Sequence, residues 1–318
     1  MKKLYQVLDR SVLNRHTAIS SWKSITLDII LHLSCWVLAY LGSEFSNWYL
    51  APVSILIIGA IQHHTGILLH EGVHGMLHPN QKVNDFLNDV FNAVPFLTFQ
   101  KNYKIYHLEH HRYSGDPDKD PEKSLYQTMG WKYDMSDGSF VFKMIFRSLL
   151  MINQIKFFTW NADFIKRMVE LKKCPKVGFS ELMAYIVFWA PVLFIIWKFG
   201  LWLHLFIFWF IPLTFVFLPL VLIHGIGEHT GEAGDYEEKK TITHHYGFIT
   251  NFFLYPIKSG YHLEHHLFPN VPWYEMEGFY KDAIKNEEYK ERATRLYTNS
   301  YFFGEHSISK VFKERDTE

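Results

Sequence analysis

Four long apolar segments dominate the pattern of hydrophobic and polar positions along this chain of 318 residues. Each segment is close to the roughly 20 residues that an α-helix needs to cross the hydrocarbon core of a bilayer. A short polar turn separates the first two segments, and a second turn near Gly200 separates the last two. We therefore predict four transmembrane helices in two hairpins, with spans at about residues 25–42, 49–69, 181–199 and 201–223.

Basic residues predict which ends of these spans face the cytosol. Lysines and arginines precede the first span and gather again between residues 166 and 176, whereas the two short turns have almost none. Because cytoplasmic loops of membrane proteins carry the excess of Lys and Arg, we expect both termini and the long middle segment in the cytosol.

Two further stretches have mixed patterns. The pattern of residues 86–99 predicts a re-entrant or interfacial segment, and that of residues 139–160 predicts a helix on the membrane surface.

Composition narrows the class of partner. Aromatic residues make up 18% of the chain and the formal net charge is zero, so nothing indicates nucleic acid as a partner. Cys35 and Cys174 are too few for a disulfide framework, and they match no metal-binding spacing. The aromatic content is high for a soluble protein.

Three histidine-rich segments carry the candidate chemistry. Within each, histidines recur at offsets of three or four residues, which place imidazole rings on one face of a helix. Imidazole is the commonest protein ligand for iron, copper and zinc, and three such segments supply more nitrogens than one metal ion accepts. The four-span topology brings all three to the same side of the membrane. The segments are His70-Glu-Gly-Val-His74, His107-Leu-Glu-His110-His111 and His262-Leu-Glu-His265-His266.

A nitrogen-rich site for two metals favours iron and O2. Two iron ions can activate O2 for removal of hydrogen from an unactivated CH2 group, whereas zinc has no redox chemistry and needs fewer ligands. Two other interpretations are less favoured. One is a membrane zinc metalloprotease, because His70-Glu-x-x-His74 is also the signature of that class. The other is a membrane metal carrier, whose sites usually lie near the bilayer midplane rather than at one surface.

The glutamates inside these segments are candidates for supporting roles. Glu109 and Glu264 lie two residues after a histidine, about 200° round a helix, and so point away from the metal face. This position predicts contacts behind the ligands or a salt bridge rather than ligation. Glu71 lies about 100° round the helix from His70, which leaves its direction open, and it is a further candidate for a contact behind the ligands.

These residues resemble the membrane fatty acid desaturase superfamily of histidine-box di-iron enzymes, over roughly residues 50–275. The stretch Gly260-Tyr-His-Leu-Glu-His-His-Leu-Phe-Pro-Asn-Val-Pro272 is the most specific part of the likeness. The resemblance implies two iron ions and O2 as co-substrate. It also implies that all eight box histidines bind iron or lie close to it: His70, His74, His107, His110, His111, His262, His265 and His266.

The resemblance extends to residues around the fourth span. Characterised members use a histidine shortly after that span, which implies His229 as a ninth ligand. Some members place an asparagine four residues earlier to hold a water on iron, but Gly225 stands here, so that detail is not carried over. His224 and the pair His244-His245 are candidates for contacts just behind the ligands. The loop Gly115-Asp-Pro-Asp-Lys-Asp-Pro121 has a composition typical of turns. Similar loops follow the second histidine box in carotenoid ketolases and several bacterial desaturase-like proteins.

These observations combine into one expectation of architecture. We expect an all-α integral membrane enzyme whose cytosolic helical cap carries the histidine boxes. The catalytic domain is predicted over residues 1–275, and a polar helical tail over residues 276–318. The chain lacks the His-Pro-Gly-Gly haem motif of fused cytochrome b5 domains, so a separate electron donor of the cytochrome b5 or ferredoxin type is expected.

The expected activity is O2-dependent introduction of a C=C bond into a fatty acyl or other lipid chain. The alternative is a lipid or carotenoid hydroxylase or ketolase, in which the same oxidant returns oxygen to the substrate carbon. Nothing in the histidine boxes separates these two activities, because the outcome depends on how the substrate is placed.

Overall fold

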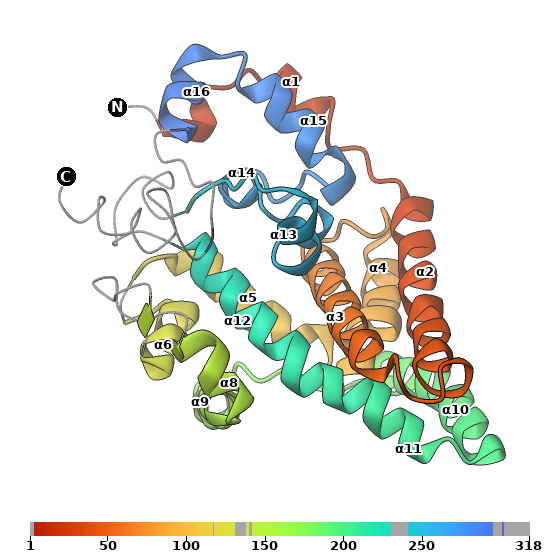
Figure 1. Cartoon of the computed structure of the whole chain (residues 1–318). Helices are drawn as coiled ribbons and strands as arrows, with labels where there is room; N and C mark the ends of the chain where they lie inside the picture. Colours follow the sequence, from red (N-terminus) through yellow and green to blue (C-terminus); the bar gives the residue numbers. More distant parts are fainter. Residues whose placement is uncertain are drawn as a thin grey trace. The chain divides into compact units, whose positions relative to one another are not determined.

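The computed structural model describes residues 3–116, 118–130, 138–139, 142–229, 241–294 and 301, which form helices joined by turns (Figure 1). In this part of the chain the only β contacts are two isolated bridges, His229 with Thr241 and Thr243 with Tyr261. The chain divides into two compact units. Unit 1 comprises residues 1–18, 105–172 and 221–318, and unit 2 comprises residues 19–104 and 173–220.

Four helices in the described residues are long and apolar enough to cross a membrane, and they match the four predicted spans. The second and fourth run further than predicted, because residues such as His70 and His224 lower the hydropathy without ending the helix. The all-α membrane fold expected from the sequence is confirmed. The four helices are Ser21–Phe45, Ala51–Val73, Phe179–Phe199 and Trp202–Glu228.

Unit 2 is built around α3 (Ala51–Val73), which packs against α2 (Ser21–Tyr40) and the π-helical segment η7 (Leu213–Phe217). Gly59 permits the close approach to η7, because a Cβ at this position would lie 2.3 Å from the Cβ of Val216. The remaining elements of unit 2 are η2 (Leu41–Phe45), α4 (Gln81–Asn88), η3 (Asp89–Ala93), η4 (Val94–Phe96), α10 (Phe179–Phe199), α11 (Trp202–Leu205) and η6 (Phe206–Phe210).

The segment predicted to be re-entrant or interfacial folds as α4, η3 and η4. Val90 and Val94 form a buried cluster with Ala184 of α10. The helical path ends after η4, and carbonyl groups of this last turn have indole partners: Trp189 Nε1 donates to the Val94 carbonyl at 3.0 Å, and an indole from η6 donates to the Pro95 carbonyl at 3.2 Å. These hydrogen bonds pair backbone carbonyl groups whose burial without a partner in an apolar environment would cost free energy.

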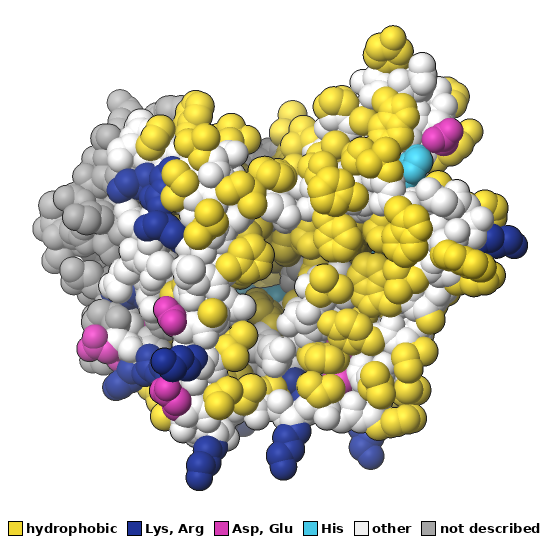
Figure 2. All heavy atoms as spheres, turned by 90° about the horizontal axis from the view of Figure 1, so that it is seen from below, with side chains coloured by type: hydrophobic (Ala, Val, Ile, Leu, Met, Phe, Trp, Pro, Cys, Tyr) yellow, Lys and Arg dark blue, Asp and Glu magenta, His cyan; other side chains and the backbone are white. Residues whose placement is uncertain are grey.

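Apolar side chains cover the outer faces of the spans. Leu33 and Val37 of α2, together with Phe194 and Trp197 of α10, are each more than half exposed. Hydrophobic side chains dominate the face of the molecule drawn in Figure 2. A surface with so many exposed aliphatic and aromatic groups is unfavourable in water and suits contact with lipid.

Unit 1 contains both His-Leu-Glu-His-His helices, α5 (Gln100–Tyr113), whose first turn belongs to unit 2, and α14 (His262–Leu267). The other elements of unit 1 are η1 (Leu4–Gln6), α1 (Arg10–Asn14), α6 (Pro121–Met129), η5 (Phe142–Phe146), α8 (Arg147–Leu149), α9 (Ile152–Glu170), α12 (Leu218–Glu228, entering from unit 2), α13 (Phe248–Phe253), η9 (Pro256–Lys258), α15 (Trp273–Ala283) and α16 (Glu287–Ala293). The stretch expected as one helix on the membrane surface, residues 139–160, instead covers η5, α8 and the first part of α9, which starts after a break at Met151, where φ is +61°.

The described region after residue 275 packs against α14. The predicted domain boundary falls inside α15. Phe279 of α15 and Tyr289 of α16 are fully buried in one apolar cluster with Leu263 of α14 and Leu4 near the N-terminus. The described part of the predicted tail therefore supports the third histidine box, and residues 295–300 and 302–318 lie outside the described residues.

Candidate metal centre

The helix α14 is short, and its position depends on buried contacts. Glu264, which is fully buried, accepts hydrogen bonds from the hydroxyl groups of Thr243, at 2.5 Å, and Tyr289, at 3.1 Å. Burial raises the pKa of the Glu264 carboxyl group, and these two hydrogen bonds oppose the rise. Glu264 thus anchors the helix from behind, on the side that faces away from the histidine rings.

One group of histidines, called the first set, consists of His107 and His111 of α5 and His265 of α14. The Nε2 atoms of His107 and His111 lie 2.9 Å apart, and those of His111 and His265 lie 3.2 Å apart. The ring nitrogens of the i, i+4 pair on α5 therefore converge with the ring nitrogen of one histidine of α14.

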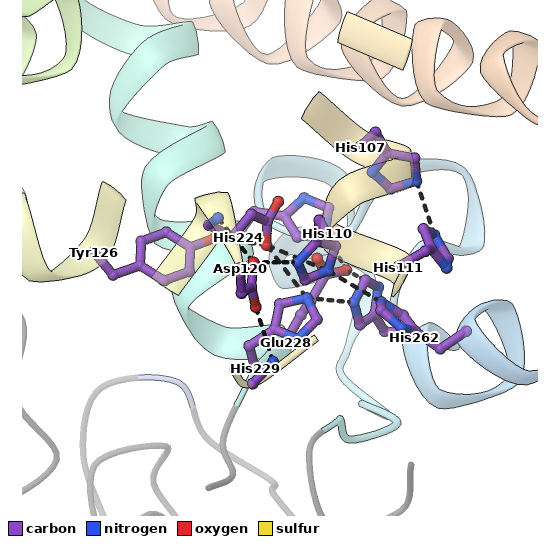
Figure 3. Close-up of polar contacts among 12 residues, drawn as sticks. His107, His110, His111, Asp120, Tyr126, His224, Glu228, His229 and His262 are labelled. Atoms are coloured by element: carbon purple, nitrogen blue, oxygen red, sulfur yellow. Dashed lines mark hydrogen bonds and ion pairs between the residues drawn. The ribbon is translucent and has the colours of Figure 1, made fainter. Parts of the chain in front are cut away.

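A second group, called the second set, consists of His110 of α5, His229 at the end of α12, and His262 and His266 of α14. One ligand nitrogen of each lies within 4.8 Å of the others. The Nε2 atoms of His229 and His262 are 2.8 Å apart, and those of His110 and His266 are 3.4 Å apart. Figure 3 shows His110, His229 and His262 directed toward one another, with the His107–His111 pair beside them.

This spacing fits metal ligation. Two imidazole nitrogens that bind one ion at about 2.1 Å, at right angles, lie about 3 Å apart. Two neutral imidazoles can share one proton in a hydrogen bond, but four rings that converge on one point cannot all pair in that way. Burial, followed by the proximity of other histidines, holds the pKa of His229 and of His266 well below the ordinary value. These rings are therefore neutral bases near neutral pH, the form that binds metal.

Two carboxylates orient imidazole rings of the second set. Asp120 Oδ1 lies 2.9 Å from His110 Nδ1, and Glu228 Oε1 lies 3.0 Å from His262 Nδ1. An Nδ1–H that donates to a carboxylate leaves Nε2 as the lone-pair nitrogen, which is the atom free to bind a metal ion. Sequence reasoning missed both carboxylates. Glu228 adjoins His229, and Asp120 lies in the acidic loop after the second histidine box, whose composition predicts only a turn. The acidic residues close in sequence to these histidines are the signal that could have identified both carboxylates.

The candidates predicted behind the ligands take different positions. His224 Nε2 lies 2.5 Å from Glu228 Oε1, so it contacts the carboxylate that orients His262. His244 Nε2–H instead donates to the carbonyl oxygen of Gly227 at 3.0 Å, and burial lowers the pKa of His244 to about 3. His245 is exposed, and its ring lies against two tyrosines rather than a histidine of either set.

The remaining predicted residues lie in α5 and at the end of α3. Glu109 of α5 is partly exposed, unlike its counterpart Glu264. In unit 2, His70 lies in the last turn of α3 and His74 caps its end, with ring centroids 5.1 Å apart. Glu71 Oε1 lies 3.8 Å from His70 Nδ1. The first box therefore has the shared helical face that its spacing predicted.

Comparison with known proteins agrees with this geometry. Residues 46–297 match the family described as fatty acid desaturase. The chain is 26% identical over 253 residues to dihydrorhizobitoxine desaturase of Bradyrhizobium elkanii, covering 78% of this chain and 71% of the relative. It is 27% identical to a sphingolipid delta(4)-desaturase of Drosophila melanogaster (74% of this chain, 67% of the relative) and 27% identical to an sn-1 acyl-lipid omega-3 desaturase (ferredoxin) of Synechocystis (74% and 68%).

The family match covers most of the chain and contains every histidine of both sets. The relatives are desaturases, and four apolar helices make this chain a multi-pass membrane protein. The chain belongs to the fatty acid desaturase family, and it is an oxidoreductase of that type.

Proposed function

We propose that this chain uses two iron ions and O2 to introduce a C=C bond into the hydrocarbon chain of a fatty acyl or other lipid substrate. The observation that carries the proposal is the convergence of seven histidines of unit 1 into two sets, within a chain of the fatty acid desaturase family. The proposed ligands are the eight box histidines and His229. A donor set made almost wholly of imidazole suits iron and leaves positions open for a small molecule.

The residues around the sets have defined tasks in this proposal. Bound iron would supply the oxidising power needed to break an unactivated C–H bond. Asp120 and Glu228 keep His110 and His262 in the tautomer that presents Nε2. The overall reaction consumes a –CH2–CH2– group, O2, two electrons and two protons, and it yields –CH=CH– and two molecules of water.

The substrate and electron donor follow from chemistry and from the relatives. Two relatives are named for sphingolipid and acyl-lipid substrates, whose shared feature is a long hydrocarbon chain. The exposed apolar surface of this chain suits an enzyme whose substrate arrives through the bilayer. The electrons come from a separate carrier of the cytochrome b5 or ferredoxin type, and the name of the Synechocystis relative includes ferredoxin.

Lipid profiling of a host that expresses the chain tests the activity. We expect new unsaturated lipid species that disappear in His110→Ala and persist in the matched control His204→Ala, a histidine outside both sets that contacts Glu44. Metal analysis of the purified wild type should find about two irons per chain. A single zinc would refute the metal assignment, and a hydroxylated product without unsaturation would refute desaturation.

We also propose that both termini and the histidine sets face the cytosol. The observation behind this orientation is the excess of basic residues before the first and third spans. Cys174, which is exposed between α9 and α10, should react with a membrane-impermeant maleimide only after the membrane is opened to its cytosolic side. The other cysteine, Cys35, is buried, and the variant Cys174→Ser is the negative control for labelling. Labelling of Cys174 in intact cells would contradict this orientation and indicate the opposite one.

A further inference from the structure

The acidic loop after the second histidine box leads directly into α6, and one carboxylate of that helix faces the second set. Glu122 lies in the first turn of α6, and only 15% of its side chain is exposed. Its Oε2 atom lies 3.4 Å from His229 Nε2 and 3.6 Å from His110 Nε2. These are the two nitrogens that His229 and His110 present to the rest of the second set. The carboxylate is thus directed at the metal-binding side of the rings.

The distances suit a shared ion better than a simple hydrogen bond. Two donor atoms at about 2.1 Å from one ion, with an angle of about 110° between them, lie about 3.4 Å apart. Direct hydrogen bonds between imidazole and carboxylate are shorter, at about 2.7–2.9 Å when charged, as in the His110–Asp120 contact of 2.9 Å. His110 therefore presents Nδ1 to one carboxylate at hydrogen-bond distance and Nε2 to another at a ligand-to-ligand distance.

Two phenols hold the Glu122 carboxylate in place. The Tyr126 hydroxyl donates to Glu122 Oε2 at 3.3 Å, and Tyr106 of α5 provides a second hydrogen bond. Figure 3 shows the Tyr126 ring reaching toward the group around His224 and Glu228. Such hydrogen bonds orient a ligating carboxylate in the same way that carboxylates orient ligating histidines.

A glycine makes room for this arrangement. A Cβ at position 225 would lie 2.1 Å from the Tyr126 hydroxyl oxygen, so any larger residue would displace the phenol. The glycine of α12 and the tyrosine of α6 are therefore a matched pair. Their fit keeps the hydroxyl within reach of Glu122.

We propose that Glu122 is a metal ligand of the second set, a carboxylate donor in addition to His110, His229, His262 and His266. The inference rests on the proposed metal function. Ligation also explains why a carboxylate is buried at this position, since a divalent ion offsets the cost of removing its charge from water. Tyr126 and Gly225 act through Glu122 and position it.

The test is metal binding by purified full-length variants. Glu122→Gln keeps the size of the side chain and removes its charge, so we expect it to retain about one ion per chain, with affinity for the second reduced at least about tenfold. Glu122→His, whose Nε2 reaches about as far as the glutamate carboxylate, should restore the second ion. The matched control is Asp116→Asn, in the acidic loop that precedes α6, where the Asp116 carboxylate accepts from the backbone amides of Asp118 and Lys119.

A second readout separates ligation from a structural role. Metal-free Glu122→Gln should unfold at the same temperature as metal-free wild type, whereas the rise in Tm on adding iron should be smaller in the variant. Two ions in Glu122→Gln, or one ion or fewer in Glu122→His, would overturn the assignment. If Glu122→Gln fails to fold, the ion count of Glu122→His decides alone. A wild type without two ions would instead refute the proposed function itself.

Discussion

The pentapeptide His-Leu-Glu-His-His occurs twice, at residues 107–111 in α5 and 262–266 in α14, and the two copies fold alike in unlike surroundings. Leu263 and Glu264 are buried, at 1% and 0% exposure, whereas Leu108 is 44% exposed and Glu109 is partly exposed. Identical local sequence therefore determines the helix and its histidine face. The surroundings decide whether the leucine and glutamate between the histidines hold the helix in the core.

The two copies also divide their histidines between the sets in opposite ways. In α5 the first and last histidines of the pentapeptide join the first set, and the middle one, His110, joins the second. In α14 the first and last join the second set, and the middle one, His265, joins the first. Residues at equivalent positions therefore belong to different sets, and each helix contributes to both sets.

Paired histidine substitutions give the largest expected effect and test this division. His111→Ala with His265→Ala removes two ligands from the first set, so the variant should retain about one ion per chain. His111→Ala with His266→Ala removes one ligand from each set and should weaken both ions, leaving fewer. Both double variants should lose activity by about 100-fold or more. Equal metal content in the two double variants, measured by elemental analysis, would show that the sets are not divided in this way.

The two leucines should differ strongly in their contribution to stability. Leu263→Ala leaves a cavity in the cluster with Phe279 and Tyr289, and should lower the free energy of unfolding by about 3 kcal/mol. Leu108→Ala, at an exposed position, should change it by less than about 0.5 kcal/mol. Chemical unfolding in detergent micelles measures the difference. Similar losses in both variants would mean that α5 is as dependent on its leucine as α14.

The two glutamates should differ in the same direction and by less. Glu264→Gln places an amide N–H group against one of two hydroxyl donors and should cost about 1–2 kcal/mol. Glu109→Gln should stay within about 0.5 kcal/mol of wild type. Tyr289→Phe in the Glu264→Gln background provides the control, because the two effects should not add if they share one hydrogen bond. Full additivity would contradict the anchoring role of Glu264.

Periodicity and spacing predict the parts of this molecule that depend on local sequence. Apolar runs are sufficient to find the four spans, and histidine offsets are sufficient to predict one ring-bearing face in each box. The expectation that Glu264 points away from the rings follows from the same geometry, and its hydrogen bonds to Thr243 and Tyr289 agree with it.

Contacts between distant segments could not be predicted in this way. The roles of Asp120 and Glu228 depend on how a loop and a helix end meet His110 and His262. The packing of α15 on Leu263 joins residues that a change in polarity had assigned to a separate tail. In each case an apolar or charged residue has many possible partners, and only the path of the chain selects one.

The crossed division of histidines has a thermodynamic consequence. In the proposed two-iron site, α5 and α14 each place histidines in both sets, so binding of a first ion would fix the two helices in the arrangement that the second ion requires. The ordering cost is then largely met before the second ion arrives, so that ion binds more tightly than it would to the metal-free chain. Metal titration should accordingly be cooperative, with few molecules that hold a single ion.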